Sequence, residues 1–373
     1  MLKVLFAFGT RPEAIKMAPV IAELRRRSSE FTFKICVTAQ HREMLDDVLA
    51  LFEINPDYDL DIMVDAQSPS QVTAAVHTKL EAILTDDRPD WLLVQGDTTT
   101  TMASSMAAFF SRVQVGHIEA GLRTGNKWQP FPEEVNRRVA DLVADLHFAP
   151  TQRARTNLIT EGVAPQDVFV TGNTGIDALL DVAQRDFNPR GTALENLEGK
   201  GRRLILLTCH RRESFGRPLQ NICTAVAKIA QMYPDDVRII FPVHPNPEVT
   251  VPVRDMLGDV SNVLLLPPVD YLSLVQLMKR SYLILTDSGG IQEEAPSLGV
   301  PVLVLREVTE RPEGVEAGAA KLVGADEAVI IAESTRLLED SEEYERMSKV
   351  SNPYGDGRAS TRIADALLDR SNS

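Results

Sequence analysis

The stretch that most constrains the fold runs from Leu283 to Leu305, with the sequence LILTDSGGIQEEAPSLGVPVLVL. An apolar run, a polar turn, a short helix ended by Gly299 and a second apolar run predict a βαβ unit. Two glycines at the helix start let a ligand approach the backbone, and the free amides and the helix dipole attract an anion, most naturally a phosphate. The candidate phosphate ligands are Ser288, Gly289 and Gly290.

Two glutamates, Glu293 and Glu294, follow these glycines within the first helical turns. A carboxylate at this position can bind two ribose hydroxyls, as acidic residues near phosphate-binding turns often do. Alternatively, both glutamates only complement the helix dipole. The pattern alone leaves both interpretations open.

The rest of the chain repeats the plan of strand, polar turn and helix. Apolar strands alternate with helices through the first part of the chain, and the alternation restarts at Arg203. This pattern is typical of doubly wound parallel sheets, so we expect an α/β protein with two doubly wound αβα Rossmann-like domains facing a cleft. The expected divisions are residues 1–170, 171–352 and 353–373, the last with a helix that crosses back to the first domain.

Cations and polar residues follow the predicted strands. Thr10 and Glu13 have the spacing of a capping box, which leaves Arg11 and Lys16 as two cations at the carboxyl end of a strand. Ligands of open α/β sheets lie at that end. Other polar turns follow strands at Gln40 and His41, at His210 and at His244, and the first of these is as well explained by a solvated loop.

Three carboxylates are candidates for function. Asp97 follows a predicted strand and is either a helix N-cap or a ligand-facing acid. Glu119 also follows a strand, with Arg123 just beyond, and charges there are costly unless the site is functional or well paired. Glu133 and Glu134 lie in the first turn of a helix, where one of them can serve only the dipole.

Composition limits the partners. With 53 acidic against 39 basic residues and a net charge of −14, the chain is unsuited to a broad nucleic-acid or anionic-membrane surface. Three widely spaced cysteines and six scattered histidines indicate neither a disulfide framework nor a metal site. Neither GxGxxG nor a P-loop occurs, and no signal peptide or membrane-spanning run is evident. We expect a cytoplasmic protein without metal or cofactor.

A set of motifs carries a family resemblance. The motifs are GTRPEAIKMAP, TAQHREML, QGDTTTT, HIEAGLRTGN followed by PFPEEVNRR, TGNTGID, CHRRESFG, PVHPNP, TDSGGIQEEAPSLGVPVLVLREVTERPE and NPYGDGRAS. Together they resemble the bacterial non-hydrolysing UDP-N-acetylglucosamine 2-epimerases over nearly the whole chain. The resemblance implies the two-domain glycosyltransferase-B fold, with UDP held mainly by the second domain. It also implies interconversion of UDP-N-acetylglucosamine and UDP-N-acetylmannosamine without nicotinamide or metal, for surface polysaccharides, and a homodimer.

The resemblance also implies roles for single residues. The catalytic set is Asp97, Glu119, Glu133 and His210. The substrate-binding set is Arg11 and Lys16 near the diphosphate, Ser288, Gly289 and Gly290 on phosphate, Glu294 on the ribose and Tyr271 by the uracil. Gln40, His41 and His244 match positions where family members bind a second, regulatory UDP-N-acetylglucosamine.

The chemistry of this substrate favours elimination and re-addition. No carbonyl acidifies the C2 proton, so simple deprotonation is implausible and breaking of the C1–O bond to UDP must share the barrier. In this route a carboxylate removes the C2 proton while cations and the helix dipole hold the charge growing on the departing diphosphate. The sequence leaves open which carboxylate serves which face of C2. The alternatives are a hydrolysing epimerase, a glycosyltransferase of the same fold, and a nucleotide-sugar-binding regulator without turnover.

Overall fold

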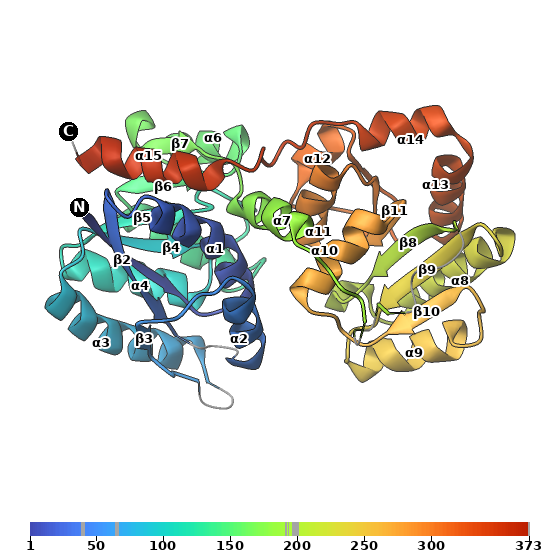
Figure 1. The fold of residues 1–373 in the computed structure, drawn as a ribbon, viewed down its shortest axis with the longest axis horizontal. Helices are drawn as coiled ribbons and strands as arrows, with labels where there is room; N and C mark the ends of the chain where they lie inside the picture. Colours follow the sequence, from blue (N-terminus) through green and yellow to red (C-terminus); the bar gives the residue numbers. More distant parts are fainter. Residues whose placement is uncertain (39–41, 64–66, 191, 193, 196–200, 372–373) are drawn as a thin grey trace. The chain divides into compact units, whose positions relative to one another are not determined.

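The computed structural model describes residues 1–38, 42–63, 67–190, 192, 194–195 and 201–371 (Figure 1). The chain forms two compact units. Unit 1 comprises Met1–Ala178 and Tyr354–Ser373, and unit 2 comprises Leu179–Pro353. The division falls within one helix, Thr174–Gln184, whereas the sequence pattern predicts a boundary at residue 170.

Unit 1 is built on a parallel seven-stranded sheet with the order β3-β2-β1-β4-β5-β6-β7. Its strands are β1 (Leu2–Phe8), β2 (Phe31–Val37), β3 (Tyr58–Asp59), β4 (Trp91–Gln95), β5 (Gln114–Ile118), β6 (Leu146–Ala149) and β7 (Val168–Val170). Its helices are α1 (Arg11–Arg26), α2 (Arg42–Leu51), α3 (Pro69–Asp87), α4 (Thr99–Phe110), α5 (Glu133–Val143), α6 (Gln152–Thr160), α7 (Thr174–Gln184), which continues into unit 2, and α15 (Ala359–Ser371), with a 3-10 turn η1 (Pro165–Asp167).

Unit 2 has a parallel six-stranded sheet with the order β10-β9-β8-β11-β12-β13. Its strands are β8 (Arg203–Thr208), β9 (Val237–Pro242), β10 (Val263–Leu266), β11 (Leu283–Thr286), β12 (Val302–Val304) and β13 (Ala320–Leu322). Its helices are α8 (Arg217–Met232), α9 (Pro247–Leu257), α10 (Tyr271–Arg280), α11 (Gly289–Glu294), α12 (Pro312–Glu316), α13 (Glu327–Glu339) and α14 (Ser341–Ser348), with 3-10 turns η2 (Arg212–Ser214) and η3 (Ala295–Leu298).

Both sheets have the same winding order. Each begins with a central strand, adds two strands on one side and then returns to add the rest on the other side. This is the doubly wound 3-2-1-4-5-6 order, whose ligands lie where the order reverses, at the carboxyl ends of the two central strands. The prediction of two Rossmann-like αβα folds is confirmed, and the switch points lie between β1 and β4 in unit 1 and between β8 and β11 in unit 2.

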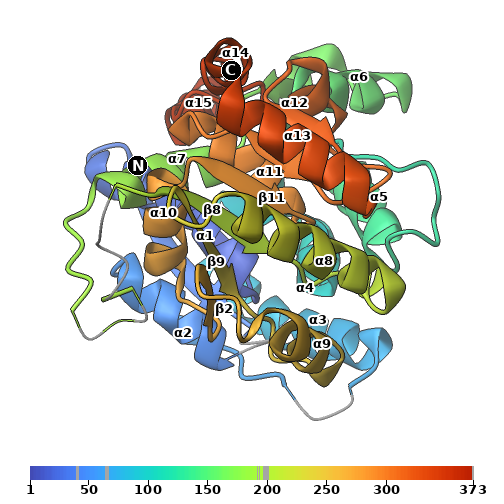
Figure 2. The same cartoon turned by 90° about the vertical axis from the view of Figure 1, so that its right-hand side faces the viewer.

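The apolar strands form these sheets because helices cover both of their faces. All five residues of β4 are buried, as expected for a central parallel strand. In unit 2, α13, α8 and α9 lie side by side in one layer (Figure 2) and bury apolar residues such as Ile222, Val226 and Ile229. Burial of each such side chain contributes about 1.5–3 kcal/mol. None of the described helices combines the length and apolar content needed to cross a bilayer.

The stretch from Leu283 to Leu305 forms the expected βαβ unit. Strand β11 leads through Asp287 and Ser288 into α11 and η3, and β12 pairs with β11 in parallel. Gly299 ends the helical segment with φ +70°, a left-handed conformation that suits glycine. The unit places the Ser288–Gly290 turn at the carboxyl end of β11, directly at the switch point of unit 2.

The C-terminal helix belongs to unit 1. Helix α15 packs against α1, and Arg27 pairs with Asp365 at 2.6 Å. Asp177 of α7 accepts hydrogen bonds from the backbone N–H groups of Ala359 (3.2 Å) and Ser360 (2.8 Å), so a carboxylate from another helix caps α15. The final segment thereby becomes part of the first folding unit.

Candidate active site

At the switch point of unit 1, one buried carboxylate joins the two turns that follow β1 and β4. Glu13 forms the expected capping box with Thr10 and accepts the N–H groups of Gly9 (3.0 Å) and Thr10 (2.7 Å). It also accepts the hydroxyls of Thr98 (2.6 Å) and Thr101 (3.0 Å) at the start of α4. Burial raises the pKa of Glu13 in spite of these donors. The turn carrying Arg11 is thus fixed to the turn carrying Asp97.

Asp97 lies in the β4–α4 turn and does not cap the helix. Thr98 is the N-cap of α4, accepting the N–H of Thr101 at 3.1 Å, so the N-cap interpretation of Asp97 is wrong. The Asp97 carboxylate instead accepts a hydrogen bond from Arg137 of α5, and Asn136 donates to the Asp97 carbonyl at 3.0 Å. Helix α5 therefore orients both the side chain and the backbone of this acid.

Glu119 directly follows β5 in a strained backbone conformation. Its φ is +67°, which is unfavourable for a residue with a Cβ and is typical of functional sites. Lys16 Nζ lies 2.7 Å and 2.6 Å from the two carboxylate oxygens, and Gln95 donates to the same group. The nearby cation Arg123 has other partners, Asp141 and Glu161. The structure therefore brings Lys16 and Glu119 together, a contact that the sequence did not predict.

Glu133 and Glu134 have different environments although they are adjacent at the start of α5. Glu134 is fully buried and accepts from the N–H groups of Thr124 (3.1 Å) and Gly125 (3.2 Å) and from Arg137 (3.2 Å). One oxygen of Glu133 is buried with no hydrogen-bond partner among the described residues. A buried polar atom without a partner calls for an explanation, and a role toward a ligand provides one. Glu134 is structural, whereas Glu133 stays a functional candidate.

A buried histidine of β5 pairs with a buried aspartate of α5. His117 of β5 is inaccessible to solvent, and its two ring nitrogens lie 2.6 Å from Asp141 Oδ1 and 2.7 Å from the carbonyl of Gly96. Arg123 pairs with the second oxygen of Asp141 at 2.8 Å. Burial alone would lower the pKa of His117, but the charge and hydrogen bond of Asp141 and the Gly96 carbonyl raise it above its usual value. Although burial opposes it, His117 and Arg123 hold the pKa of Asp141 at about 2.

At the switch point of unit 2, Asp287 has the role that Glu13 has in unit 1. Asp287 is fully buried and accepts the N–H groups of His210 (2.9 Å) and Arg211 (2.9 Å) and the hydroxyl of Ser214 (2.9 Å). His210 Nδ1 lies 3.2 Å from the same carboxylate. One acid at the end of β11 therefore sets the turn after β8 and the orientation of the His210 ring.

The predicted phosphate-binding turn lies beside two arginines. A Cβ built on Gly289 would lie 3.5 Å from Arg211 Nη2 and 3.5 Å from Arg311 Nε, so both guanidinium groups flank this backbone. The Ser288 hydroxyl makes no capping bond to α11. Arg311 also pairs with Glu293 at 2.6 Å, which makes Glu293 a partner of a cation and not only a dipole complement. The arginines add the positive charge that glycines alone lack.

Two further contacts of unit 2 involve predicted site residues. Tyr271 Oη donates to Glu294 Oε1 at 3.4 Å, so the candidates for the uracil and the ribose lie together. The rings of His210 and His244 stack with centroids 6.3 Å apart, and His244 Nδ1 accepts the N–H of Asn246 at 3.2 Å. His244 is therefore adjacent to a predicted catalytic residue. Gln40 and His41 lie outside the described residues.

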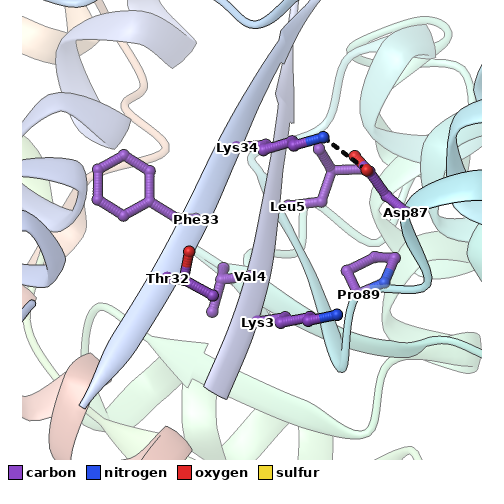
Figure 3. A pocket seen from close by; sticks show the side chains of 8 residues that line it. All are labelled: Lys3, Val4, Leu5, Thr32, Phe33, Lys34, Asp87 and Pro89. Atoms are coloured by element: carbon purple, nitrogen blue, oxygen red, sulfur yellow. Dashed lines mark hydrogen bonds and ion pairs between the residues drawn. The ribbon is translucent and has the colours of Figure 1, made fainter. Parts of the chain in front are cut away.

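Two pockets are lined by other residues of unit 1. One of about 140 Å³ lies among β1, β2 and the segment that precedes β4, and Figure 3 shows Lys34 reaching across it toward Asp87. The other, of about 450 Å³, is lined by α3, α4 and α5 and includes Asn136. Neither contains a residue of the predicted site. Within the described parts of the chain, no group of three or more His, Cys, Asp or Glu is arranged to hold a metal ion.

Several residues of the two sites were not singled out by sequence reasoning. They are Gln95, His117, Arg137 and Asp141 in unit 1 and Arg211, Asp287 and Arg311 in unit 2. Some lie inside the motifs that carried the resemblance, such as PFPEEVNRR for Arg137. Pattern alone could not separate them from surface charges, because their role depends on contacts between distant segments.

The two sheets define a protein of the glycosyltransferase-B fold class. A sequence profile of the UDP-N-acetylglucosamine 2-epimerase family matches residues 22–368. The UDP-N-acetylglucosamine 2-epimerase of Salmonella typhimurium is 53% identical over 371 residues, covering 98% of each chain. The chain belongs to the UDP-N-acetylglucosamine 2-epimerase family.

Solved structures give the same family. The Neisseria meningitidis UDP-GlcNAc 2-epimerase bound to UDP-GlcNAc aligns with a TM-score of 0.89 and 49% identity, covering 99% of this chain and 100% of that one. The Methanocaldococcus jannaschii UDP-GlcNAc 2-epimerase in complex with UDP-GlcNAc and UDP aligns with a TM-score of 0.80 and 34% identity, with coverage of 99% and 100%. The resemblance inferred from the motifs is confirmed.

The buried pair predicts a particular pH dependence of stability. Because folding raises the pKa of His117, this residue contributes its full stabilisation of the folded state at pH values below its usual pKa of 6.5. The contribution is lost as the pH rises through the pKa of His117 in the folded protein. Asp141, whose pKa is lowered, contributes its full stabilisation of the folded state at pH values above its usual pKa of 3.8. This contribution is lost as the pH falls toward the folded-state pKa of about 2. The stability difference between wild type and His117→Phe should therefore be largest between these two limits. On the alkaline side it should shrink by up to about 1.4 kcal/mol per pH unit.

Urea unfolding of both proteins across this pH range measures the difference. The matched control is His147→Phe, which removes a buried histidine on the neighbouring strand that has no carboxylate hydrogen-bond partner among the described residues and whose near contact is one backbone carbonyl at 2.8 Å. A wild-type advantage that stays constant from acid to alkaline pH would show that His117 carries no extra proton in the folded protein.

Proposed function

We propose that this protein reversibly converts UDP-N-acetylglucosamine to UDP-N-acetylmannosamine by epimerisation at C2. The observation that carries the proposal is a pair of carboxylates at the strand ends of unit 1, Asp97 and Glu119, with a third, Glu133, at the start of α5, the helix whose Arg137 binds Asp97. Asp97 and Glu119 are each held by a cation, and Glu133 keeps a buried oxygen without a partner in the described chain. Relatives with the same fold have been solved with UDP-GlcNAc bound, which supports this substrate.

The proposed reaction is elimination followed by re-addition. A carboxylate removes the C2 proton, the C1–O bond breaks and its electron pair leaves with UDP, so that C1 and C2 become joined by a double bond. UDP then attacks C1 again while C2 receives a proton on the opposite face. Acid-base catalysis supplies the proton steps, and fixed positive charge supports the leaving diphosphate.

Each unit supplies one part of this chemistry in the proposal. Unit 1 contributes Asp97, Glu119 and Glu133 as acid-base groups, with Arg11 and Lys16 as cations near the diphosphate. Unit 2 contributes the Ser288–Gly290 turn for phosphate, Glu294 for the ribose and Tyr271 for the uracil. His210 donates to the diphosphate. The adjacent pair Tyr271–Glu294 and the arginines beside Gly289 support the nucleotide assignment.

The test is incubation of the purified protein with UDP-N-acetylglucosamine alone in heavy water, followed by NMR. We expect a mixture of the two epimers with deuterium at C2, and traces of UDP with an unsaturated 2-acetamidoglucal. Free N-acetylmannosamine would select a hydrolysing epimerase, a requirement for an acceptor would select a glycosyltransferase, and no change would select a regulator. Product with protium retained at C2 would falsify elimination.

Variants extend the same experiment to the residues. Asp97→Asn, Glu119→Gln and Glu133→Gln keep the side-chain shape and should each lower kcat by about 100-fold to 10,000-fold. His210→Ala should cost about 100-fold, the typical loss of a donor to a developing anion. UDP binding, measured by calorimetry, should survive in the three amide variants because its main contacts lie in unit 2. Glu134→Gln does not serve as a control for the three amide variants, because the buried Glu134 carboxylate itself accepts hydrogen bonds from Thr124, Gly125 and Arg137.

We also propose that a second UDP-N-acetylglucosamine activates turnover through Gln40, His41 and His244. The stacking of His244 on His210 supports a link between this site and catalysis. His244→Ala should epimerise UDP-N-acetylmannosamine with little response to added UDP-N-acetylglucosamine, whereas the wild type should respond strongly. An unchanged activation ratio in the variant would reject the assignment, whatever its absolute rate.

A homodimer in the cytoplasm completes the proposal. Apolar side chains that are exposed in the single chain gather on two adjacent helices, with Phe109 (55%) and Phe110 (63%) on α4 and Leu142 (83%) on α5. Exposed apolar side chains on two helices that pack together suit an interface with a second copy of this chain. Light scattering after gel filtration should give a dimer, and Leu142→Glu should shift it toward monomer. An exposed apolar residue of unit 2, Met232 (51%), provides the control Met232→Glu.

A further inference from the structure

The chain of charged contacts around Asp97 closes on itself. From the Asp97 carboxylate it passes through Arg137 to Glu134 (3.2 Å), from Glu134 to Arg138 (3.6 Å) and on to Glu161 (3.2 Å). It continues through Arg123 (2.7 Å) to Asp141 (2.8 Å) and His117 (2.6 Å). His117 then contacts the carbonyl of Gly96, the residue before Asp97 (2.7 Å). The two ends of this chain hold the side chain and the backbone of one proposed catalytic acid.

The hydrogen-bond partners define the charge of His117. A backbone carbonyl can only accept a hydrogen bond, and an ionised carboxylate can only accept as well. Both ring nitrogens of His117 face such acceptors, Gly96 O and Asp141 Oδ1. Both nitrogens must therefore donate, which makes the ring an imidazolium. The other charged or titratable groups that face this pair are Arg123 beyond β5 and His147 of β6, whose Nε2 lies 2.8 Å from the Asp141 carbonyl.

The Gly96 peptide is fixed from two directions. Its N–H donates to the carbonyl of Ile118 at 3.0 Å, and its carbonyl accepts from His117, so both contacts come from β5. Its φ of +75° is left-handed, a conformation that suits glycine directly before Asp97. On either side of this peptide, Gln95 donates to Glu119 and Asp97 accepts from Arg137. A small rotation of this peptide would displace Asp97, the residue that follows it.

We infer that His117 is a positioning residue for the proposed epimerisation, acting as a doubly donating imidazolium at neutral pH that holds the Gly96–Asp97 turn in its working geometry. The inference rests on the proposed function, because it assigns the effect to Asp97. His117 is buried and does not act on substrate itself. Misplacement of a catalytic group by about 1 Å can cost about 100-fold in rate, which sets the expected size of the effect.

The test compares two phenylalanine variants of buried histidines on neighbouring strands. His117 and His147 lie opposite each other in the register of β5 and β6. His117 bonds to the Gly96 carbonyl, whereas His147 bonds to the carbonyls of Asp141 and Asp167. Rates are expressed per enzyme able to bind UDP, so that unfolded protein is not counted. His117→Phe should lower kcat by about 100-fold with KM within about 3-fold, and His147→Phe should leave kcat within about 3-fold. Equal kcat losses in both variants would show that His117 has only a structural role and would refute the positioning role.

A double variant separates this inference from the proposed function. In the Asp97→Asn background, His117→Phe should cause no further loss of kcat, because its effect acts through Asp97. A further loss of about 100-fold there would refute the positioning role while leaving the role of Asp97 intact. Full activity of Asp97→Asn alone would instead overturn the catalytic role of Asp97, and the inference with it.

The protonation state gives an independent readout. Nitrogen-15 NMR of histidine-labelled protein, assigned by the signal lost in His117→Gln, should show both ring nitrogens protonated at neutral pH. A neutral tautomer at that pH would overturn the inference directly. The glutamine pair His117→Gln and His147→Gln also replaces the phenylalanine pair where solubility requires it, with the same expected contrast in kcat.

Discussion

A buried carboxylate that bridges two strand ends is the interaction on which both sites depend. Glu13 in unit 1 and Asp287 in unit 2 each accept two backbone N–H groups from one turn at the switch point. Glu13 also accepts the hydroxyls of Thr98 and Thr101 from the turn after β4. Asp287 itself lies in the turn after β11, which is the second turn at the switch point of unit 2. A buried carboxylate is costly unless donors surround it, so each turn can adopt only the geometry that satisfies the acid. Two loops that would otherwise vary independently become one rigid edge.

Charge at the edge of unit 1 is arranged in pairs, and this arrangement has a cost. Buried ion pairs repay the loss of hydration only when their geometry is good and their remaining lone pairs are bonded. Asp141 meets this condition with His117, Arg123 and the N–H of Gly121 at 3.3 Å. Hydrophobic residues of similar size would often be as stable there. The retention of charge so close to Asp97 and Glu119 therefore fits a role in orientation better than a role in stability.

The sequence was most reliable where local physics decides the outcome. The 283–305 stretch, the capping box of Thr10 and Glu13 and the alternation of buried strands with helices all appear in the structure as predicted. The interpretation of Asp97 as an N-cap failed because the next residue, Thr98, takes that position. A one-residue shift in a cap lies within the uncertainty of helix boundaries read from sequence. The site roles carried over by resemblance still await the experiments above.

What the sequence by itself determined was therefore the fold class, the family and the strand ends at which chemistry-bearing residues collect. Periodicity and turn residues act over a few positions, so they can be read without the rest of the chain. Only the tertiary structure decided which of those residues meet. Lys16 reaches Glu119 across 103 positions, and His210 depends on Asp287, 77 positions away. The pairing of His117 with Asp141 and Gly96 likewise follows from sheet order and helix packing, because charges with equal local patterns differ only in the neighbours that folding gives them.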